Sequence, residues 1–556
     1  MAAVQFRKLE EDENGIGKVH IGLSGVDSKK DQTFTVDDAI EHCGFGLFQI
    51  WVSIFSGLIW MVFAMEVMLL SILAPEIRCD FNLTDWQEAL ITTIFFCGML
   101  FGSILWGKVL DNWGRKLGLF LSEIWVCYFS MLSAFAHSYV WLLVLRFLIG
   151  FGLSASPQVV TYYAEFLPVK SRAYCLVLVE VFFNIGLILE VVLAIIVMPR
   201  LNWRWLLGLT AIPLFIDLFT FKFAPESPRY YVAARQLDKA RRVLEKVAKI
   251  NDKPLPAGRL VSDQDRKTFE TVQGSYSSTG SIAHANDDST DSDVIKAEDS
   301  HIETTIVSET EQLLTSNDES KINQVYHSDH GSIFGLFSSK QLGGSTILLL
   351  FIWFGMSCTY YGVTFLTTEM LAIVKERSND STVVPCIEYA PVDDTHCARL
   401  EQNDYLTVMW TTAAESPGVI ITALIIERIG RKKTMAVELA VCAAMFLLML
   451  ICPIKMTVFM VFVFITRALA TGAFQAVYVY TPEIFPTSVR GLGLGCCSGA
   501  ARLGAITTPF IAQVLLRVSM DGAKGTYAAI SLLCSVFALL LPIETKGRIM
   551  KEQVDQ

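Results

Sequence analysis

Eight ionisable side chains interrupt apolar runs that are long enough to cross a lipid bilayer. An ionised group inside lipid costs free energy, so such residues usually serve an ion or solute pathway or pair with one another. For each of them, a buried structural pair competes with a functional role. The eight residues are Glu66, Glu180, Glu190, Asp217, Glu369, Glu415, Glu438 and Arg502.

Two of these side chains predict specific chemistry. A guanidinium holds a carboxylate through two parallel hydrogen bonds, so Arg502 favours an organic anion or a zwitterion as solute unless a glutamate neutralises it. Glu66 is a candidate carrier of a coupling proton, because removal from water favours the uncharged form of a carboxyl group. Aromatic rings in the same runs could stack on a flat solute, although most of them would serve only for packing. The aromatic candidates are Trp60, Tyr162, Trp353, Tyr360, Tyr361, Trp410, Phe474 and Tyr478.

The elements that must hold these residues are apolar helices. Of the 556 residues, 53% are hydrophobic and 18% are charged, against about 25% charged in a soluble protein. About 20 apolar residues in a helix cross a hydrocarbon core of roughly 30 Å, so we expect an all-α membrane protein with twelve transmembrane helices. The expected spans lie near residues 50–74, 89–110, 117–136, 139–161, 174–198, 204–224, 345–372, 405–426, 434–453, 456–480, 491–516 and 525–543.

Short basic loops indicate the orientation. Lysine and arginine are enriched in the cytosolic loops of membrane proteins, and Arg115, Arg172, Arg431 and Arg490 all fall in alternate loops. We therefore expect these loops and both termini in the cytosol. The expected organisation is a cytosolic segment at 1–45, a six-helix half at 46–226, a largely disordered cytosolic loop at 227–340, a second six-helix half at 341–545 and a cytosolic tail at 546–556.

Two glycosylation sequons fall in loops that we expect on the non-cytosolic side. They begin at Asn82 and Asn379, and each match is weak by itself because such triplets also occur by chance. Cys386 and Cys397 share the second of these loops. A disulfide between them fits an oxidising lumen, and two unpaired thiols fit nearly as well.

The central loop has the composition of a disordered segment. Residues 228–250 still show apolar residues at helical spacing, whereas residues 259–332 are rich in Ser, Thr, Asp and Glu and have few aromatic residues. Glu309 precedes the paired Leu313 and Leu314 by four residues, which resembles an adaptor-binding dileucine sorting signal. A chance pair of leucines is an equal alternative.

Four short motifs occur twice, in the same order and at nearly one offset. Such a repeat predicts two pseudo-symmetric six-helix halves, related by an axis along the membrane normal. Each motif pairs an acid with arginines at expected cytosolic helix ends, where arginine–carboxylate pairs could hold the halves together as a gate. The alternative is that these arginines only fix the topology. The candidate gate residues are Asp111, Arg115, Arg146, Glu165, Arg172, Glu226, Arg229, Glu427, Arg431, Arg467, Glu483, Arg490, Glu544 and Arg548.

No motif predicts an enzyme, a cofactor or a metal site. The net charge of -10 comes from the polar segments, and no basic stripe predicts binding to nucleic acid. No spacing of Cys and His fits a zinc site. Gly150-Phe-Gly152 resembles a dinucleotide fingerprint, but it lies in an apolar span and follows no strand.

Together the motifs resemble the major facilitator superfamily. The two Gly-Arg-Lys loops and the segments 225–229 and 544–548 are similar to its sugar-porter and organic-ion branches, and the closest resemblance is to the synaptic-vesicle-two-related (SVOP) family. It extends from about residue 34 to residue 548, apart from the central loop. The resemblance is also carried by residues 72–75, 163–168, 192–194, 203–206, 366–369, 431–435, 478–483, 509–513 and 541–543.

The resemblance implies a fold in which spans one, four, seven and ten line a cavity, which would allow Glu66 and Glu369 to face it. Arg502 resembles a position in span eleven that is arginine in the organic-anion branch. The family also implies a synaptic vesicle or endosomal membrane. One departure is that SVOP-like proteins usually have an acid three residues before the glutamate of span one, where this chain has Phe63. Proton or cation coupling is therefore in doubt.

Residues and resemblance together predict a secondary transporter. It would move a small organic ion, an anion or a zwitterion, across a vesicle or endosomal membrane by alternating access. The alternative is a non-transporting vesicle protein that uses the fold for ligand sensing or partner binding, for which Phe63 and the acidic loop leave room. The expected partners are the solute, a proton, sorting adaptors and the lipid bilayer, and we expect a monomer.

Overall fold

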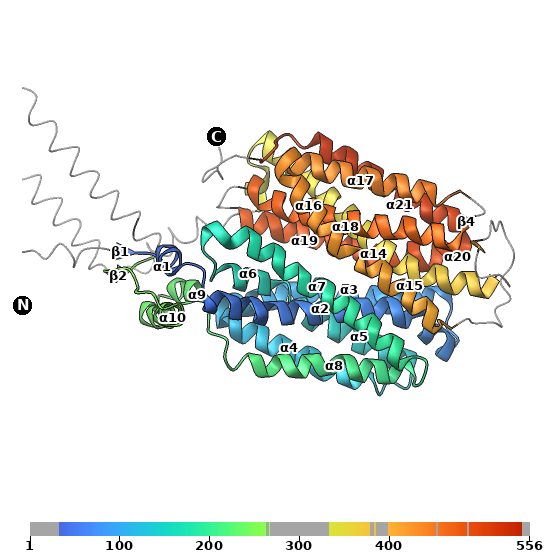
Figure 1. The fold of residues 1–556 in the computed structure, drawn as a ribbon, viewed down its shortest axis with the longest axis horizontal. Helices are drawn as coiled ribbons and strands as arrows, with labels where there is room; N and C mark the ends of the chain where they lie inside the picture. Colours follow the sequence, from blue (N-terminus) through green and yellow to red (C-terminus); the bar gives the residue numbers. More distant parts are fainter. Residues whose placement is uncertain are drawn as a thin grey trace, which may run out of the picture.

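Long helices that run side by side make up most of the protein (Figure 1). The computed structural model describes residues 33–262, 266, 333–377, 383–384, 399–451, 454–485 and 489–546. Within these ranges, each β-strand is only two residues long. The bundle itself is therefore helical, in agreement with the expected all-α class. The strands are β1 Thr33–Phe34, parallel to β2 Arg259–Leu260, and β3 Val383–Val384, antiparallel to β4 Ile454–Lys455.

The first half of the bundle follows the six spans expected from residues 46–226. Its fourth span is interrupted, because residues 154–157 form a turn that ends with Pro157, which has no backbone N–H to continue a helix. The elements are α2 Leu47–Phe81, α3 Asp85–Trp113, α4 Arg115–Ser133, α5 Tyr139–Leu153, α6 Gln158–Ala164, α7 Val169–Val197 and α8 Trp203–Thr220.

The second half repeats this order. Its second span is interrupted at Ala414, and its fifth contains a π-helical turn, η2, directly after Pro509. Short π-helical turns often mark functional sites. The elements are α14 Lys340–Arg377, α15 Gln402–Ala413, α16 Glu415–Ile429, α17 Arg431–Leu448, α18 Met456–Ile484, α19 Arg490–Pro509, η2 Phe510–Leu515, α20 Leu516–Val518 and α21 Met520–Leu540.

Ten spans in the described ranges are long and apolar enough to cross a membrane. Interrupted spans such as α5 with α6, or α15 with α16, each count once. Two further helices, α4 and α17, lie alongside them in the bundle (Figure 1). Both begin with the repeated Arg-Lys motif and contain one acid, which lowers their apolarity. The expected count of twelve includes these two helices.

A small helical cap covers one end of the bundle, which we call the near end (Figure 1). The cap contains α1 Val36–Cys43, α9 Pro228–Ala233 and α10 Leu237–Ile250. Ile40 of α1 and Leu244 of α10 belong to one buried apolar cluster. The helix expected within 228–250 is confirmed, with a break between α9 and α10. Residues 1–45 were expected only as a polar segment, so α1 with its capping box was not predicted.

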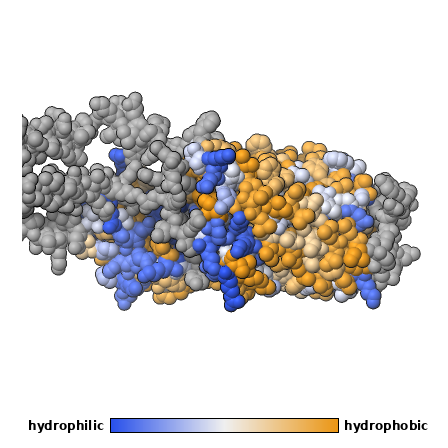
Figure 2. Space-filling view, turned by 90° about the horizontal axis from the view of Figure 1, so that it is seen from above, coloured by the Kyte–Doolittle hydropathy of each residue, from blue (hydrophilic) through white to orange (hydrophobic). Residues whose placement is uncertain are grey.

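The opposite end, where α2 is followed by α3, is called the far end. A short helix on the near side, η1 Ile333–Phe337, leads into α14. Along the flank of the bundle the surface is mostly apolar, and hydrophilic residues concentrate toward the near end (Figure 2). Large apolar side chains such as Phe101, Phe135 and Phe219 are exposed on the outer surface of the bundle, as expected for helices whose outer surface contacts lipid. The two halves meet chiefly where α3 packs on α19 and α7 packs on α15.

Candidate substrate site

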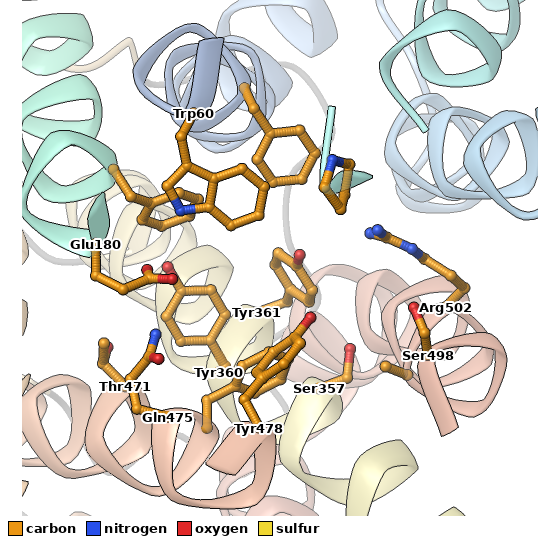
Figure 3. A pocket seen from close by; sticks show the side chains of 15 residues that line it. Trp60, Glu180, Ser357, Tyr360, Tyr361, Thr471, Gln475, Tyr478, Ser498 and Arg502 are labelled. Carbon is orange, nitrogen blue, oxygen red and sulfur yellow. The ribbon is translucent and has the colours of Figure 1, made fainter. Parts of the chain in front are cut away.

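A narrow cavity lies between the two halves, near the middle of each helix that lines it (Figure 3). Its volume is about 60 Å³, which is room for roughly four ordered waters. A larger solute therefore fits only when side chains or whole halves move apart. The lining residues are Trp60, Phe63, Pro157, Glu180, Phe183, Ser357, Tyr360, Tyr361, Thr471, Phe474, Gln475, Tyr478, Ser498, Ala501 and Arg502.

Aromatic rings form most of the cavity wall. From the first half, Trp60 and Phe63 stack with their ring centroids 4.9 Å apart. From the second half, Tyr360 and Tyr361 meet edge to face at 5.1 Å, and neighbouring rings continue the wall (Figure 3). Phe63, at the position where an acid was expected, is thus part of an apolar surface. Rings in this arrangement can stack on a flat group of a solute.

Two charged side chains line the cavity, and they approach it from opposite ends (Figure 3). Glu180 extends from α7, beside the Trp60 indole and the Gln475 amide. Arg502 extends from α19, where its guanidinium lies 3.6 Å from the sulfur of Met99. No carboxylate in the described ranges lies within ion-pairing distance of Arg502. From the sequence, Glu180 was expected only as an ionisable residue within a span, and it was not predicted to line the pocket.

Nine residues were expected at the substrate site, and five of them line this cavity: Trp60, Tyr360, Tyr361, Tyr478 and Arg502. Four do not. Trp410 is exposed on the outside of the bundle, where it stacks on Phe464 with centroids 5.2 Å apart. Glu66, Glu369 and Glu415 are buried beside arginines and do not line the cavity. Helical position alone could not determine these orientations.

Arg146 and Arg467 were expected at the cytosolic gate, and this placement is corrected. Both side chains are buried inside their own halves. Arg146 lies 3.6 Å from Glu66, which also accepts a hydrogen bond from Ser130. Arg467 lies 2.7 Å from Glu415. The two arginines occupy matched places in the repeat, and each compensates an otherwise unpaired charge in a low-dielectric interior.

Glu415 also connects one of these pairs to the cavity wall. The hydroxyl of Tyr360 donates to Glu415 at 3.1 Å, while the ring of Tyr360 lines the cavity. The pair of Arg467 and Glu415 therefore lies directly behind the wall and orients this ring. Its charges are already matched, so it adds little net charge to the site.

At the far end, an ion-pair network joins the two halves. Arg517 of α20 lies 3.1 Å from Glu369 of its own half, and 3.5 Å and 3.8 Å from Asp85 and Glu88 of α3. Arg78 of α2 completes the network at 3.0 Å from Asp85 and 3.6 Å from Glu88. The side chains of Glu88, Glu369 and Arg517 are buried. Removal of one charge would leave its partners uncompensated.

Further hydrogen bonds join the two halves at the same end. The backbone N–H of Leu400 and the hydroxyl of Tyr405 both donate to Glu76 of α2, at 3.3 and 3.4 Å. Ser71 of α2 contacts the hydroxyl of Thr368 in α14 at 3.0 Å. Of the ionisable residues at this end, only Glu369 was singled out from the sequence, because Arg78, Asp85 and Arg517 lie at helix ends and belong to none of the repeated motifs.

At the near end, each half contains the same ion-pair arrangement. Arg115 lies 2.8 Å from Asp111 and 3.7 Å from Glu165. We expected such pairs to hold the two halves together, but each of them joins helices within one half, and this expectation is corrected. The same holds in the second half, where Arg431 lies 3.1 Å from Glu427 and 3.2 Å from Glu483.

Two more repeated acids cap helices. Glu226 accepts a hydrogen bond from the backbone N–H of Lys116 at 3.0 Å. Glu544 accepts hydrogen bonds from the backbone N–H groups of Arg431 and Lys432 at 2.8 and 3.2 Å. The first N–H groups of a helix have no partner within the helix, and the positive end of the helix dipole attracts a carboxylate. These acids therefore fix the starts of α4 and α17.

The glycines of the repeated loops make these caps possible. Gly114 and Gly430 have φ of 106° and 96°, a region that side chains disfavour. A Cβ atom at Gly114 would lie 2.4 Å from an oxygen of Glu226, and one at Gly430 would lie 2.6 Å from the carboxyl carbon of Glu544. Glycine is thus required both by the backbone and by the capping carboxylate.

The remaining gate candidates have local contacts. Arg172 and Arg490 each donate, at 3.2 Å, to the backbone carbonyl five residues earlier. Arg229 of α9 pairs with Asp37 of α1 within the helical cap, and Arg172 of α7 lies 3.8 Å from the same carboxylate, which connects the cap to the bundle. Arg548 lies outside the described residues. The near-end motifs as a whole therefore stabilise single halves and the cap.

Of the two sequons, the structure describes one. Asn82 is exposed in the short turn between α2 and α3, with φ of 51°. Close to it, Cys79 is disulfide-bonded. Outside the described residues lie the second sequon at Asn379, the cysteine pair Cys386 and Cys397, and the sorting candidates Glu309, Leu313 and Leu314.

Comparison with known proteins relates these features to a family. A family model described as "Sugar (and other) transporter" matches residues 35–279, and one described as "Major Facilitator Superfamily" matches residues 381–555. The chain is 43% identical to the Synaptic vesicle 2-related protein of Xenopus laevis, over 94% of this chain and 83% of that protein. It is 41% identical to the protein of the same name from Rattus norvegicus, over 99% and 93%.

A solved structure with the same fold is the inward-open conformation of the xylose transporter XylE from E. coli. The TM-score is 0.60 at 14% sequence identity, and the match covers 91% of this chain and 98% of XylE. The major facilitator fold expected from the sequence is confirmed. The chain is a multi-pass membrane protein that belongs to the synaptic vesicle 2-related family of major facilitator transporters.

Proposed function

We propose that this chain is a secondary transporter of a small organic ion, an anion or a zwitterion, and that it works by alternating access in a vesicle or endosomal membrane. The observation that carries the proposal is the cavity between the halves, lined by aromatic rings and by Arg502. A guanidinium without a protein carboxylate is free to bind a carboxylate of a solute. The neighbouring rings supply the apolar contact that most ligand sites use.

The contacts between the halves support alternating access. Among the described residues, polar contacts between the halves lie at the level of the cavity or nearer the far end, as the bonds of Arg517 and Glu76 illustrate. This conformation is therefore closed at the far end, and its near-end ion pairs would not have to break for the halves to separate there. A rocking motion of the two halves would separate them at the far end and bring them together at the near end.

We further propose that the near end faces the cytosol and the far end the lumen. The basic residues of the repeated loops lie at the near end, as the positive-inside rule requires for cytosolic loops. The exposed position of Asn82 at the far end suits glycosylation. Replacement of Asn82 by Gln should then remove one glycan, which a shift in gel mobility after expression in a glycosylating cell would detect.

The test of transport is uptake by purified protein in liposomes. Organic anions, zwitterions and cations would be offered with and without a pH gradient, and Arg502→Ala would be measured beside the unaltered protein. We expect uptake of at least one anion or zwitterion, and its loss in Arg502→Ala. Absence of any flux from a well-folded preparation would contradict transport. Thermal stabilisation by a solute without flux would instead favour the ligand-sensing alternative.

A further inference from the structure

The two charged side chains that line the cavity have opposite signs, and neither has an ion-pair partner among the residues that the structure describes. By contrast, the fully buried arginines near the site are compensated by ion pairs, as Glu66 compensates Arg146 and Glu415 compensates Arg467. Glu180 and Arg502 have no such partner in the described part of the chain. Their contacts are with an amide, an indole, a phenol and a thioether.

These two side chains also come from different halves. Glu180 belongs to α7 of the first half, whereas Arg502 belongs to α19 of the second. They approach the cavity from opposite ends, and the rings of Tyr360, Tyr361 and Tyr478 lie between them (Figure 3). A solute that pairs with both charges would therefore span an aromatic surface and contact both halves.

A solute with one charge would satisfy only half of this arrangement. A pure anion on Arg502 would leave the half-buried Glu180 carboxylate without a cation, and an unpaired charge that is partly removed from water is costly. A pure cation on Glu180 would leave the Arg502 guanidinium in the same condition. A zwitterion compensates both groups at once.

We propose that the site selects zwitterions, with a cationic amine directed to Glu180, an anionic group directed to Arg502, and a flat apolar body between the tyrosines. This inference rests on the proposed function and narrows its substrate class from an anion or zwitterion to a zwitterion. Because the solute bridges the halves, its binding would favour the conformation in which they approach each other.

Three probes of one shape test this selection: para-aminomethylbenzoate, para-methylbenzoate and para-methylbenzylamine. The first is a zwitterion with its charges at opposite ends of a ring, and the others keep only the anion or only the cation. Binding to the full-length protein in detergent would be measured by calorimetry and by thermal stabilisation. We expect the zwitterion to bind at least tenfold more tightly than either probe with a single charge.

Variants that neutralise one of the two charges should remove the preference for the zwitterion over one of the singly charged probes. Glu180→Gln should bind the anion as tightly as the zwitterion, and Arg502→Gln should bind the cation as tightly as the zwitterion. Glu180→Asp keeps the charge and should retain the preference, which separates recognition from misfolding. The matched controls are Glu245→Gln and Arg241→Gln, which alter an exposed ion pair on α10 and should bind like the unaltered protein.

Two outcomes would overturn the inference. One is equal binding of para-methylbenzoate and the zwitterion by the unaltered protein, with no effect of Glu180→Gln. The other is no binding of any probe at millimolar concentration. Uptake into liposomes separates this inference from transport itself. Zwitterion binding without flux would contradict the transporter and leave the recognition standing, whereas flux of anions that is insensitive to Glu180→Gln would contradict the recognition and leave the transporter standing.

Discussion

The near end and the far end of the bundle both contain arginine–carboxylate pairs, yet the pairs connect different parts of the molecule. At the near end, Arg115 and Arg431 each bind acids of their own half. At the far end, Arg517 binds its own half through Glu369 and the other half through Asp85. The same chemistry therefore makes each half rigid at one end and holds the two halves together at the other.

The difference shows why a charge motif does not identify a gate by itself. A pair within one half keeps its geometry when the halves rotate, so its interaction energy is not lost during the transport cycle. A pair between the halves must break before the bundle opens at that end, and its charges are then either exposed to water or left buried without a partner. In this conformation, only the far-end network has the connectivity of a gate among the residues described.

The largest expected effect is that of Arg517→Ala. It would leave Glu88 and Glu369 buried without their shared cation, a loss of about 3–5 kcal/mol by analogy with broken buried pairs. We expect the far end to open, which spin labels at the exposed Thr84 and Val518 would report as a longer distance. Arg431→Ala is the control and should leave this distance unchanged. An unaltered distance in Arg517→Ala would remove the distinction between the two ends.

A smaller effect is expected at the near-end glycines. Gly430→Ala should lower the free energy of unfolding by about 2–3 kcal/mol, because it adds strain at positive φ and displaces the capping Glu544. Thermal unfolding in detergent would measure the loss. Gly107→Ala in α3 is the control, since no atom lies within 4 Å of its added Cβ, and should be neutral or slightly stabilising. An equal change in the unfolding free energy of the two variants would contradict the explanation that Gly430 is required by its positive φ and by the capping Glu544.

The near-end arginines should act independently. Arg115→Ala and Arg431→Ala should each cost about 1–2 kcal/mol of unfolding free energy, since both pairs are only partly buried. In the double variant the two losses should add to within about 0.5 kcal/mol, because the sites lie in separate halves and share no partner. Strong coupling in thermal unfolding would mean that the near end, too, links the halves.

The smallest effect is expected from Glu76→Gln at the far end. The amide oxygen can still accept from the Leu400 N–H and the Tyr405 hydroxyl, so only the charge interaction with the exposed Arg399 is lost. We expect a change below about 1 kcal/mol in unfolding free energy and no change in the far-end label distance. An opening as large as that of Arg517→Ala would show that the gate is distributed over the whole far end.

Much of the fold could be predicted from particular residues. Apolar runs located the helices because a span must satisfy its backbone internally in lipid. The repeated Gly-Arg-Lys loops predicted two equivalent halves, and Gly114 and Gly430 indeed adopt the same conformation. The break at Pro157 and the unexpected α1 were not predicted, because a short interruption or a short capped helix leaves the apolar pattern almost unchanged.

The sequence by itself determined that acids and arginines lie within the spans, and that Arg502 could bind an anion. Only the tertiary structure decided which of them are already paired. Glu66, Glu369 and Glu415 face arginines, while Glu180 and Arg502 face the cavity. The physical reason is that helix rotation and the packing of distant spans set the neighbours of each charge. In a helix that is apolar on nearly every side, the sequence contains no signal of that rotation.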